Sequence, residues 1–409
     1  MEFTDTNITR ILSIGEEVIG GENLEKLFTN KKEIIAYDGF EPSGRMHIAQ
    51  GLLRAHNVNK FIDSGVKFKF WVADWFALMN LKLGGDINKI QKAGRLMIET
   101  WKACGMKLDA VDSEGKSMIE FIWSSEEINK RTEEYWKLVL DIGTKFGLTR
   151  IKKCTQIMGR KEDILVESTI DQLKFRLEFL KNYINNDGST ISSKTNFLIN
   201  ELNELTNSID LLMDTNKNEL TTSQIFYPVM QCADIFFLGI DICSLGMDQR
   251  KVNMLALEYC DKIKKKNKPI IISHHMIMGL DGSDKMSKSN PDNTVFMDDS
   301  EIDVKRKINK AFCELGNIDK NPLLDWAKYI IFPLVGHLII PANEKWNEPE
   351  IIFYTCDVLV KSFADGKIQP KALKDAMITH INQLLKPVRN HFSLKEPAEL
   401  LKIVKSYTK

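Results

Sequence analysis

Several features are scarce or missing in this 409-residue chain, and each absence excludes a class of protein. The seven cysteines are scattered without a C-x-x-C pair, which argues against a structural zinc site or a disulfide framework. The 56 basic and 56 acidic residues cancel, so bulk charge gives no hint of a nucleic-acid partner. No apolar run approaches the roughly 18 residues that span a bilayer, and the N-terminus lacks the pattern of a leader peptide. We therefore expect a cytoplasmic protein without a membrane partner or a tightly bound metal.

What is present is an alternation of short apolar runs with helical patterns. Such an alternation predicts an α/β fold with a parallel sheet and right-handed crossovers. The predicted strands lie near residues 34–37, 68–73, 121–123, 243–246 and 269–273. Ligands bind such sheets at the carboxyl ends of the strands, where we place Tyr37, Asp74 and Ser124.

The remaining segments read mainly as helix. Residues 1 to about 33, 47–63, 87–104 and 126–160 carry apolar residues at helical spacing. From about residue 300 the pattern is helical throughout and is punctuated by prolines, which predicts a separate C-terminal domain over 300–409. The preceding residues, 1–299, form the predicted sheet domain.

The stretch 36–51, AYDGFEPSGRMHIAQG, joins a predicted strand to a predicted helix through a glycine-containing turn. Unpaired backbone N–H groups and the helix dipole make such a helix N-terminus favourable for phosphate. Gly39 and Gly44 punctuate the turn, and His47 stands where a side-chain donor can join the backbone groups. Taken alone, the stretch is better explained as an ordinary turn with one solvated histidine, because glycine turns are common.

A second motif changes this balance, because residues 285–289 read KMSKS. Together with PSGRMHIAQ at 42–50, a variant of the H-I-G-H signature, it resembles the class I aminoacyl-tRNA synthetases. YDGFEPSG, YPVMQCADIFFLG and GMDQRKVNML further resemble the tyrosyl-tRNA synthetases of the archaeal and eukaryotic cytosolic type. The resemblance implies a Rossmann-like catalytic domain over 1–299, with the KMSKS loop at 279–292, and a helical anticodon-binding domain over 300–409.

Relative to that family, the segment of about 163–220 is inserted. Its leucines recur at helical spacing on either side of an Asn-Asn-Asp-Gly-Ser turn, which predicts an appended helical hairpin; a disordered loop is the alternative. The resemblance places part of a dimer interface in the preceding segment, 126–160, and therefore implies a homodimer.

The helix expected over 227–238, with Pro228 in its first turn, carries three polar residues on one face of an otherwise apolar segment. Tyr227, Gln231 and Asp234 fall within roughly 60° of one another at about 100° per residue. A carboxylate and an amide on a buried face need partners, since an unpaired buried charge is costly. The partner is either another element of the protein or a polar ligand in a dry pocket.

The resemblance assigns roles to individual residues. Tyr37 and Asp234 would meet the phenolic hydroxyl of tyrosine, while Tyr227, Gln231 and Gln249 would hold its α-amino end. Glu41 and Asp74 either support that end or form structural salt bridges. The implied ATP-binding residues are Gly39, Gly44, His47, Gln50, Lys285, Met286, Ser287, Lys288 and Ser289. The implied catalytic residues among these are His47, Gln50, Lys285 and Lys288. The signature is altered at two positions, since Ala49 replaces its glycine and Gln50 replaces its second histidine. Gln50 therefore cannot act as a cation.

The implied reaction is ATP-dependent ligation of L-tyrosine to tRNA(Tyr) through an adenylate, with Mg²⁺ accompanying ATP. Trp346 is expected to stack on the first anticodon base, or else to belong to the core of the helical domain. Ala372 stands where archaeal relatives have a base-reading aspartate, which leaves the reading of that base open. The alternatives are a tryptophanyl-tRNA synthetase and a non-catalytic RNA-binding relative.

Overall fold

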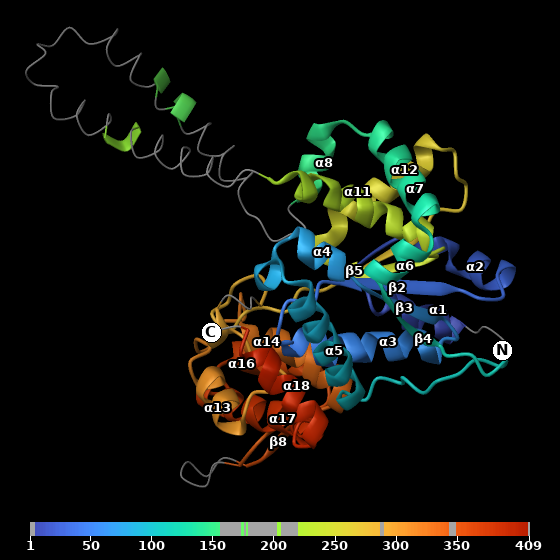
Figure 1. The fold of residues 1–409 in the computed structure, drawn as a ribbon. Helices are drawn as coiled ribbons and strands as arrows, with labels where there is room; N and C mark the ends of the chain where they lie inside the picture. Colours follow the sequence, from blue (N-terminus) through green and yellow to red (C-terminus); the bar gives the residue numbers. More distant parts are fainter. Residues whose placement is uncertain are drawn as a thin grey trace, which may run out of the picture. The chain divides into compact units, whose positions relative to one another are not determined.

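The computed structural model describes residues 5–155, 220–286, 290–342 and 349–407, with short helical stretches at 173–175, 177–178 and 203–205. The chain forms two compact units (Figure 1). The first contains residues 1–145 and 231–409, and the second contains residues 146–230. Apart from the three short stretches, the predicted hairpin of the insert lies outside the described residues.

A six-stranded sheet forms the centre of the first unit. Its strand order is β1-β6-β5-β2-β3-β4, and every neighbouring pair is parallel except β1 with β6. The strands are β1 (Glu17–Ile19), β2 (Ile35–Phe40), β3 (Lys67–Val72), β4 (Ile119–Trp123), β5 (Ile242–Gly246) and β6 (Ile270–His274). The predicted parallel sheet is confirmed.

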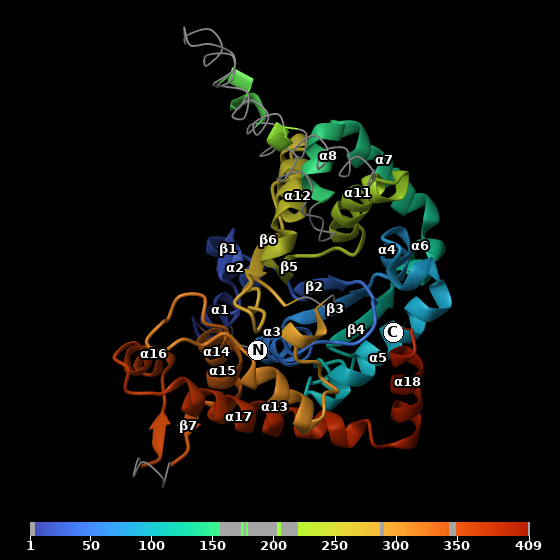
Figure 2. The same ribbon diagram turned by 90° about the vertical axis from the view of Figure 1, so that its left-hand side faces the viewer.

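Helices connect these strands. In chain order they are α1 (Asp5–Leu12), α2 (Leu24–Asn30), α3 (Arg54–Asp63), α4 (Asp74–Met79), α5 (Ile87–Ala103), α6 (Ser124–Lys130), α7 (Thr132–Lys145), α8 (Leu148–Cys154), α11 (Thr222–Phe237) and α12 (Arg250–Lys262). Short 3₁₀ turns occur at η1 (Gly21–Asn23), η3 (Lys82–Gly85), η7 (Met247–Gln249) and η8 (Pro291–Asn293), and η2 (Ala49–Leu53) is a π-turn. Within the first unit, α3 and α5 lie on one face of the sheet and α12 on the other (Figure 2).

Alternation along β2 sends its side chains to opposite faces of the sheet. Ala36 and Phe40 join the hydrophobic core with residues of α3 and α5. Tyr37 and Gly39 therefore face the opposite side. On the core side, Phe70 stacks on Phe121 with ring centroids 5.0 Å apart.

Helix α5 shows how local sequence determines an element. Asp86 caps its N-terminus by accepting hydrogen bonds from the backbone N–H groups of residues 88 and 89. Ile90, Leu96, Met97 and Trp101 recur at helical spacing and are fully or almost fully buried. Replacing such a cap by alanine typically costs about 1 kcal/mol.

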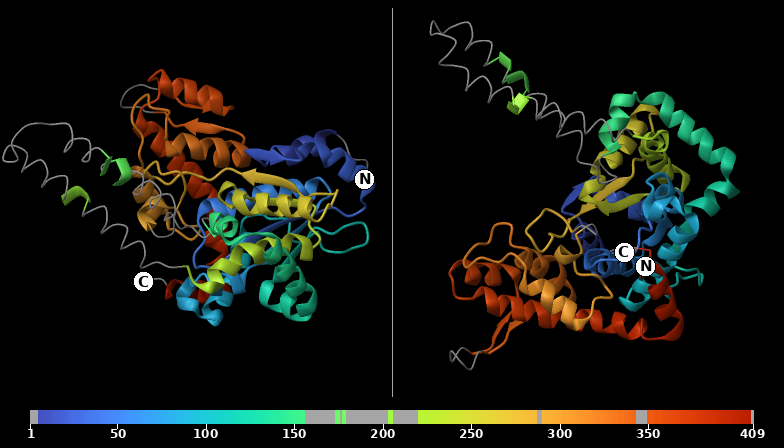
Figure 3. Two further views of the ribbon diagram at one scale, coloured as in Figure 1. Left: turned by 90° about the horizontal axis from the view of Figure 1, so that it is seen from above. Right: turned by 60° about the vertical axis from the view of Figure 1, so that its left-hand side comes forward.

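The C-terminal part of the first unit is mostly helical. It consists of α13 (Glu301–Asn309), α14 (Pro322–Trp326), the π-turn η9 (Ala327–Ile331), α15 (Phe332–Val335), α16 (Cys356–Ala364), α17 (Pro370–His391) and α18 (Lys395–Lys405). An antiparallel hairpin of β7 (Leu338–Ile340) and β8 (Ile351–Phe353) interrupts the helices, and β7 packs against α17 (Figure 3). The predicted fold, a parallel sheet followed by a mostly helical region, is confirmed.

Four expectations about individual elements were wrong. Residues 17–19 form an edge strand on β6 rather than helix, and residues 338–340 and 351–353 are strands within the region read as wholly helical. The helix read through 126–160 is divided, within its described part, into α6, α7 and α8. Helix α11 begins at Thr222, so Pro228 lies inside it and not in its first turn.

Candidate active site

The point where the strand order reverses lies at β2, which has β5 on one side and β3 on the other. The chain runs from β2 to β3 and β4 in one direction, and through β5 to β6 in the other. Ligands of open parallel sheets bind beside such a reversal, at the carboxyl ends of the strands. Asp74 and Ser124 follow the ends of β3 and β4 as expected. Tyr37 is the third residue of β2, because that strand continues to Phe40.

Tyr37 and Asp234 lie within electrostatic reach of each other in the interior of the first unit. Each side chain is 1% exposed. Burial, the neighbouring Cys243 and the Asp234 carboxylate raise the pKa of Tyr37 well above its ordinary value. Among the described residues, the Tyr37 hydroxyl has no hydrogen-bond partner. A buried hydroxyl without a partner is rare in a native fold.

A third residue, Tyr135 of α7, completes this arrangement. Its hydroxyl donates a hydrogen bond to Asp234 Oδ1 at 2.8 Å, and its side chain is fully buried. Burial raises the pKa of Asp234 well above its ordinary value, and the hydrogen bond from Tyr135 acts in the opposite direction. Tyr135 is absent from the residues predicted from the sequence. Its only signal there was a place on the buried stripe of an amphipathic helix.

The amide pair expected at the amino end of the substrate is close together. Gln231 Nε2 of α11 donates to Gln249 Oε1 of η7 at 3.1 Å. Gln231 Oε1 is buried without a partner among the described residues, so an acceptor remains for a ligand donor. Tyr227 lies on α11 one turn before Gln231, in the second unit.

Asp74 and Glu41 belong to separate networks. The fully buried Asp74 carboxylate accepts five hydrogen bonds, all from neutral donors: Trp75 N, Ser124 Oγ, Ser125 N, Ser125 Oγ and Gln91 Nε2. Asp74 thereby joins α4, α5 and α6. Glu41 accepts hydrogen bonds from Asn80 and forms a salt bridge with Lys82 at 3.5 Å.

The signature turn differs from the expected helix start. Gly44 has φ = 113°, a backbone conformation that favours glycine. His47 forms an antiparallel bridge with Phe296 instead of opening the helix, which begins as the π-turn η2. The Gln50 backbone N–H donates to His47 Nδ1 at 3.4 Å. With this bond, the proton of a neutral imidazole lies on Nε2.

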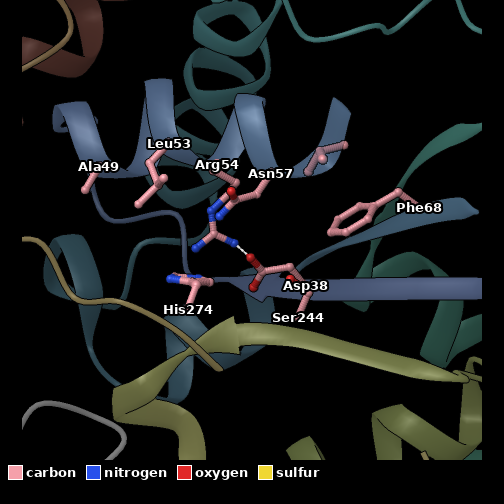
Figure 4. Close-up of a pocket in the computed structure, with 9 residues that line it drawn as sticks. Asp38, Ala49, Leu53, Arg54, Asn57, Phe68, Ser244 and His274 are labelled. Atoms are coloured by element: carbon pink, nitrogen blue, oxygen red, sulfur yellow. Dashed lines mark ion pairs between the residues drawn. The ribbon is translucent and has the colours of Figure 1, made fainter. Parts of the chain in front are cut away.

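A buried ion pair lies on the other face of β2, beneath the signature helix. Arg54 of α3 pairs with Asp38 of β2, and Figure 4 shows the guanidinium between this carboxylate and His274 of β6. Burial lowers the pKa of Arg54 to about 10 and that of His274 to about 4. The pair fixes the helix that follows the signature to the strand that carries Tyr37.

The KMSKS segment is partly described. Lys285 Nζ forms a salt bridge with Asp248 Oδ2 at 3.1 Å, next to Gln249. Met286 is buried, and its backbone N–H donates to Ile277 O at 2.9 Å. Four predicted site residues lie outside the described residues: Ser287, Lys288, Ser289 and Trp346.

Within the described ranges, no group of three or more His, Cys, Asp or Glu side chains could hold a metal ion. In the same part of the chain, no helix is both long and apolar enough to cross a membrane.

Comparison with known proteins places this geometry in a family. The model of the family described as tRNA synthetases class I (W and Y) matches residues 29–174 and 192–386. Tyrosine–tRNA ligase 1, cytoplasmic, of Arabidopsis thaliana is 43% identical over 97% of this chain and 87% of its own length. The Leishmania major tyrosyl-tRNA synthetase in complex with tyrosinol matches with a TM-score of 0.78 and 41% identity. That match covers 99% of this chain, which spans 61% of the Leishmania chain. The Pyrococcus horikoshii tyrosyl-tRNA synthetase complexed with L-tyrosine gives a TM-score of 0.73 at 28% identity, over 97% of this chain and 99% of that one. The chain belongs to the class I tRNA synthetases of the tryptophan and tyrosine family.

Proposed function

We propose that this protein is a tyrosine–tRNA ligase that acts in the cytoplasm, as the name of the Arabidopsis relative states for that protein. The proposal rests on the buried pair of Tyr37 and Asp234. The hydroxyl of Tyr37 lacks a hydrogen-bond partner among the described residues. A buried phenol beside a buried carboxylate suits a substrate that brings its own hydroxyl. Phenylalanine would leave the Tyr37 hydroxyl unpaired and would offer Asp234 nothing beyond its bond from Tyr135, and discrimination on this basis is already known for tyrosine enzymes of this class.

The remaining pocket residues would bind the polar end of tyrosine. The free oxygen of Gln231 is an acceptor for the α-ammonium group, and Gln249 holds the Gln231 amide in place. Tyr227 would contribute from the preceding turn of α11. Asp74 and Glu41 would act as neighbouring negative charges, each held in place by its own donors.

In the first step, a carboxylate oxygen of tyrosine attacks the α-phosphorus of ATP. The bond between the α- and β-phosphates breaks, and pyrophosphate leaves. No enzyme nucleophile is needed; the protein positions the two substrates and neutralises the developing charge. His47 Nε2–H, Gln50 and the backbone at Gly39 and Gly44 would contact the nucleotide.

The KMSKS segment, 285–289, would neutralise the charge of the leaving pyrophosphate. Lys285 exchanges its contact with Asp248 for the phosphates, and Lys288 adds a second cation, while Met286, Ser287 and Ser289 shape the loop. Mg²⁺ would arrive with ATP and be held mainly by the phosphates, which is how this ion is usually bound with nucleotides.

In the second step, a hydroxyl of the terminal ribose of tRNA(Tyr) attacks the acyl carbon, and AMP leaves. We assign residues 1–299 to this chemistry and residues 300–409 to the anticodon, with Trp346 stacking on its first base. A homodimer is part of the proposal, with 126–160 contributing to the interface.

Amino-acid-dependent ATP–pyrophosphate exchange tests the proposal. Exchange that depends on tyrosine supports it, whereas exchange that depends on tryptophan identifies the tryptophan enzyme. Absence of exchange with tyrosine, tryptophan and phenylalanine identifies a non-catalytic relative. Asp234→Ala should abolish the preference for tyrosine over phenylalanine, and an unchanged preference would contradict the assigned pocket.

A further inference from the structure

Main-chain pairing joins the first signature motif to the segment that follows the KMSKS loop. The backbone N–H of Ile48 donates to Val295 O at 3.0 Å, and that of Met297 donates to Met46 O at 2.9 Å. His47 and Phe296 are the bridge partners between these bonds. The segment that follows the KMSKS loop therefore lies against the first motif, and any displacement of residues 294–299 also displaces His47.

Charged side chains next to the paired segments hold them together. Arg45 Nε donates to Asp298 Oδ1 at 2.9 Å, and Arg45 Nη2 donates to Asp299 Oδ1 at 2.9 Å. The guanidinium also lies over the Phe296 ring, 4.1 Å from its centroid. Arg45 is two residues before His47 and directly after Gly44, so its position constrains the signature turn itself.

The same two aspartates receive cations from three C-terminal helices. Lys307 of α13 pairs with Asp299 Oδ2 at 2.6 Å, and both side chains are 4% exposed. Lys405 of α18 pairs with Asp298 Oδ2 at 2.6 Å. Arg389 of α17 donates to the Asp299 backbone oxygen at 3.0 Å. We name Arg45, Asp298, Asp299, Lys307 and Lys405 the Arg45 cluster.

We infer that Arg45 is a positioning residue for adenylate formation, through which the C-terminal helices determine the placement of His47. The inference rests on the proposed function. None of the cluster's ion pairs in the described part of the chain reaches Tyr37, Gln231 or Asp234. Loss of the cluster should therefore impair the use of ATP and leave tyrosine binding intact, an asymmetry that a general loss of stability would not produce.

The first test compares Arg45→Met and Arg45→Lys with the wild-type protein. In tyrosine-dependent ATP–pyrophosphate exchange, Arg45→Met should lower kcat/KM for ATP on the order of tenfold, since small misplacements of positioned groups reduce rates steeply. Its Kd for tyrosine, measured by calorimetry without ATP, should be unchanged. Arg45→Lys keeps the charge but loses the two-pronged geometry, and it should recover part of the rate.

The second test acts from the C-terminal side, with a matched control. Lys405→Met removes one cation from the cluster and should lower kcat/KM for ATP less than Arg45→Met does. Lys402→Met is the control, because Lys402 lies one turn away on α18, is exposed and makes no ion pair in the described part of the chain. It should behave as wild type. The double variant Arg45→Met/Lys405→Met should be no worse than Arg45→Met, because the two residues act through one cluster.

Two results would overturn the inference. One is normal ATP kinetics in Arg45→Met. The other is a parallel loss of ATP use, tyrosine binding and melting temperature, which would reduce Arg45 to a stabilising residue. Failure of the proposed function looks different, because wild-type protein itself would then show no tyrosine-dependent exchange.

Discussion

Replacing Tyr135 by phenylalanine removes a single hydroxyl from the proposed tyrosine site while keeping the ring. The lost hydrogen bond joins Tyr135 to Asp234 Oδ1 at 2.8 Å, within a site where Asp234 is 1% exposed. Hydrogen bonds to charged groups contribute about 1.5–3 kcal/mol, and 1.4 kcal/mol corresponds to about tenfold. We therefore expect kcat/KM for tyrosine to fall at least about tenfold, while that for phenylalanine, which has no hydroxyl to place, stays near its wild-type value.

The same substitution should shift the pH profile. The hydrogen bond from Tyr135 lowers the pKa of Asp234, which burial raises, so its removal raises that pKa further. In the proposed site the ionised Asp234 carboxylate accepts the hydrogen bond from the substrate phenol, so the acid limb of the tyrosine kcat/KM profile should move to higher pH in Tyr135→Phe.

Tyr259→Phe supplies a matched control. Tyr259 of α12 donates to Asp141 Oδ2 of α7 at 2.6 Å, which is the same kind of bond away from the proposed substrate contacts. It should leave the tyrosine-to-phenylalanine ratio unchanged. The reasoning is refuted if Tyr135→Phe keeps the wild-type ratio, or if both variants lower it by the same factor.

Two further changes test the packing and electrostatics around the site. Burial lowers the pKa of His275, but the Asp325 and Glu16 carboxylates together outweigh burial, and the net pKa is raised. The histidine therefore stabilises the fold below its unfolded pKa of about 6.5, and this contribution is lost as pH rises through the folded pKa. Urea unfolding should accordingly show His275→Asn to be less stable than wild type at pH 5.5, with the difference shrinking towards pH 8; a gap that does not depend on pH would contradict the assignment. An alanine at Gly94 would place its Cβ 2.7 Å from the rigid Trp123 indole, so overpacking of about 1–3 kcal/mol should exceed the gain in helix propensity of about 1 kcal/mol. Gly143→Ala, which meets nothing within 4 Å, should instead stabilise the protein by up to about 1 kcal/mol, and equal urea midpoints for the two alanine variants would refute this reading.

The sheet was largely predictable because its parallel strands are short apolar runs. The predicted runs near 34–37 and 269–273 correspond to β2 (Ile35–Phe40) and β6 (Ile270–His274). The edge strand β1 was missed because three half-buried residues show no periodicity. The start of α11 was predicted too late, because proline is common in the first turn of a helix and Pro228 was placed there. In the structure Pro228 lies inside the helix, which begins at Thr222.

The site could be predicted only where a motif carried it. Tyr37 and Asp234 were identified by resemblance, and their interaction in the buried interior is consistent with the assigned pocket. Tyr135 could not be predicted from the sequence, because 99 positions separate it from Asp234. In the sequence of an amphipathic helix, a buried tyrosine that donates to a distant carboxylate looks the same as a buried tyrosine that only packs in the core. The pairing of Lys285 with Asp248 depends likewise on how distant segments meet in space.

The bridge between His47 and Phe296 closes a loop of roughly 250 residues. Contacts between residues so far apart in the sequence form late in folding, because closing the loop costs chain entropy before the contact stabilises the chain. During synthesis the first motif, residues 42–50, emerges early. Its partner segment, residues 294–299, and Lys405 of α18, which pairs with Asp298, are translated much later. A ribosome-bound chain halted before residue 294 should thus possess most of the central sheet and remain unable to make an adenylate.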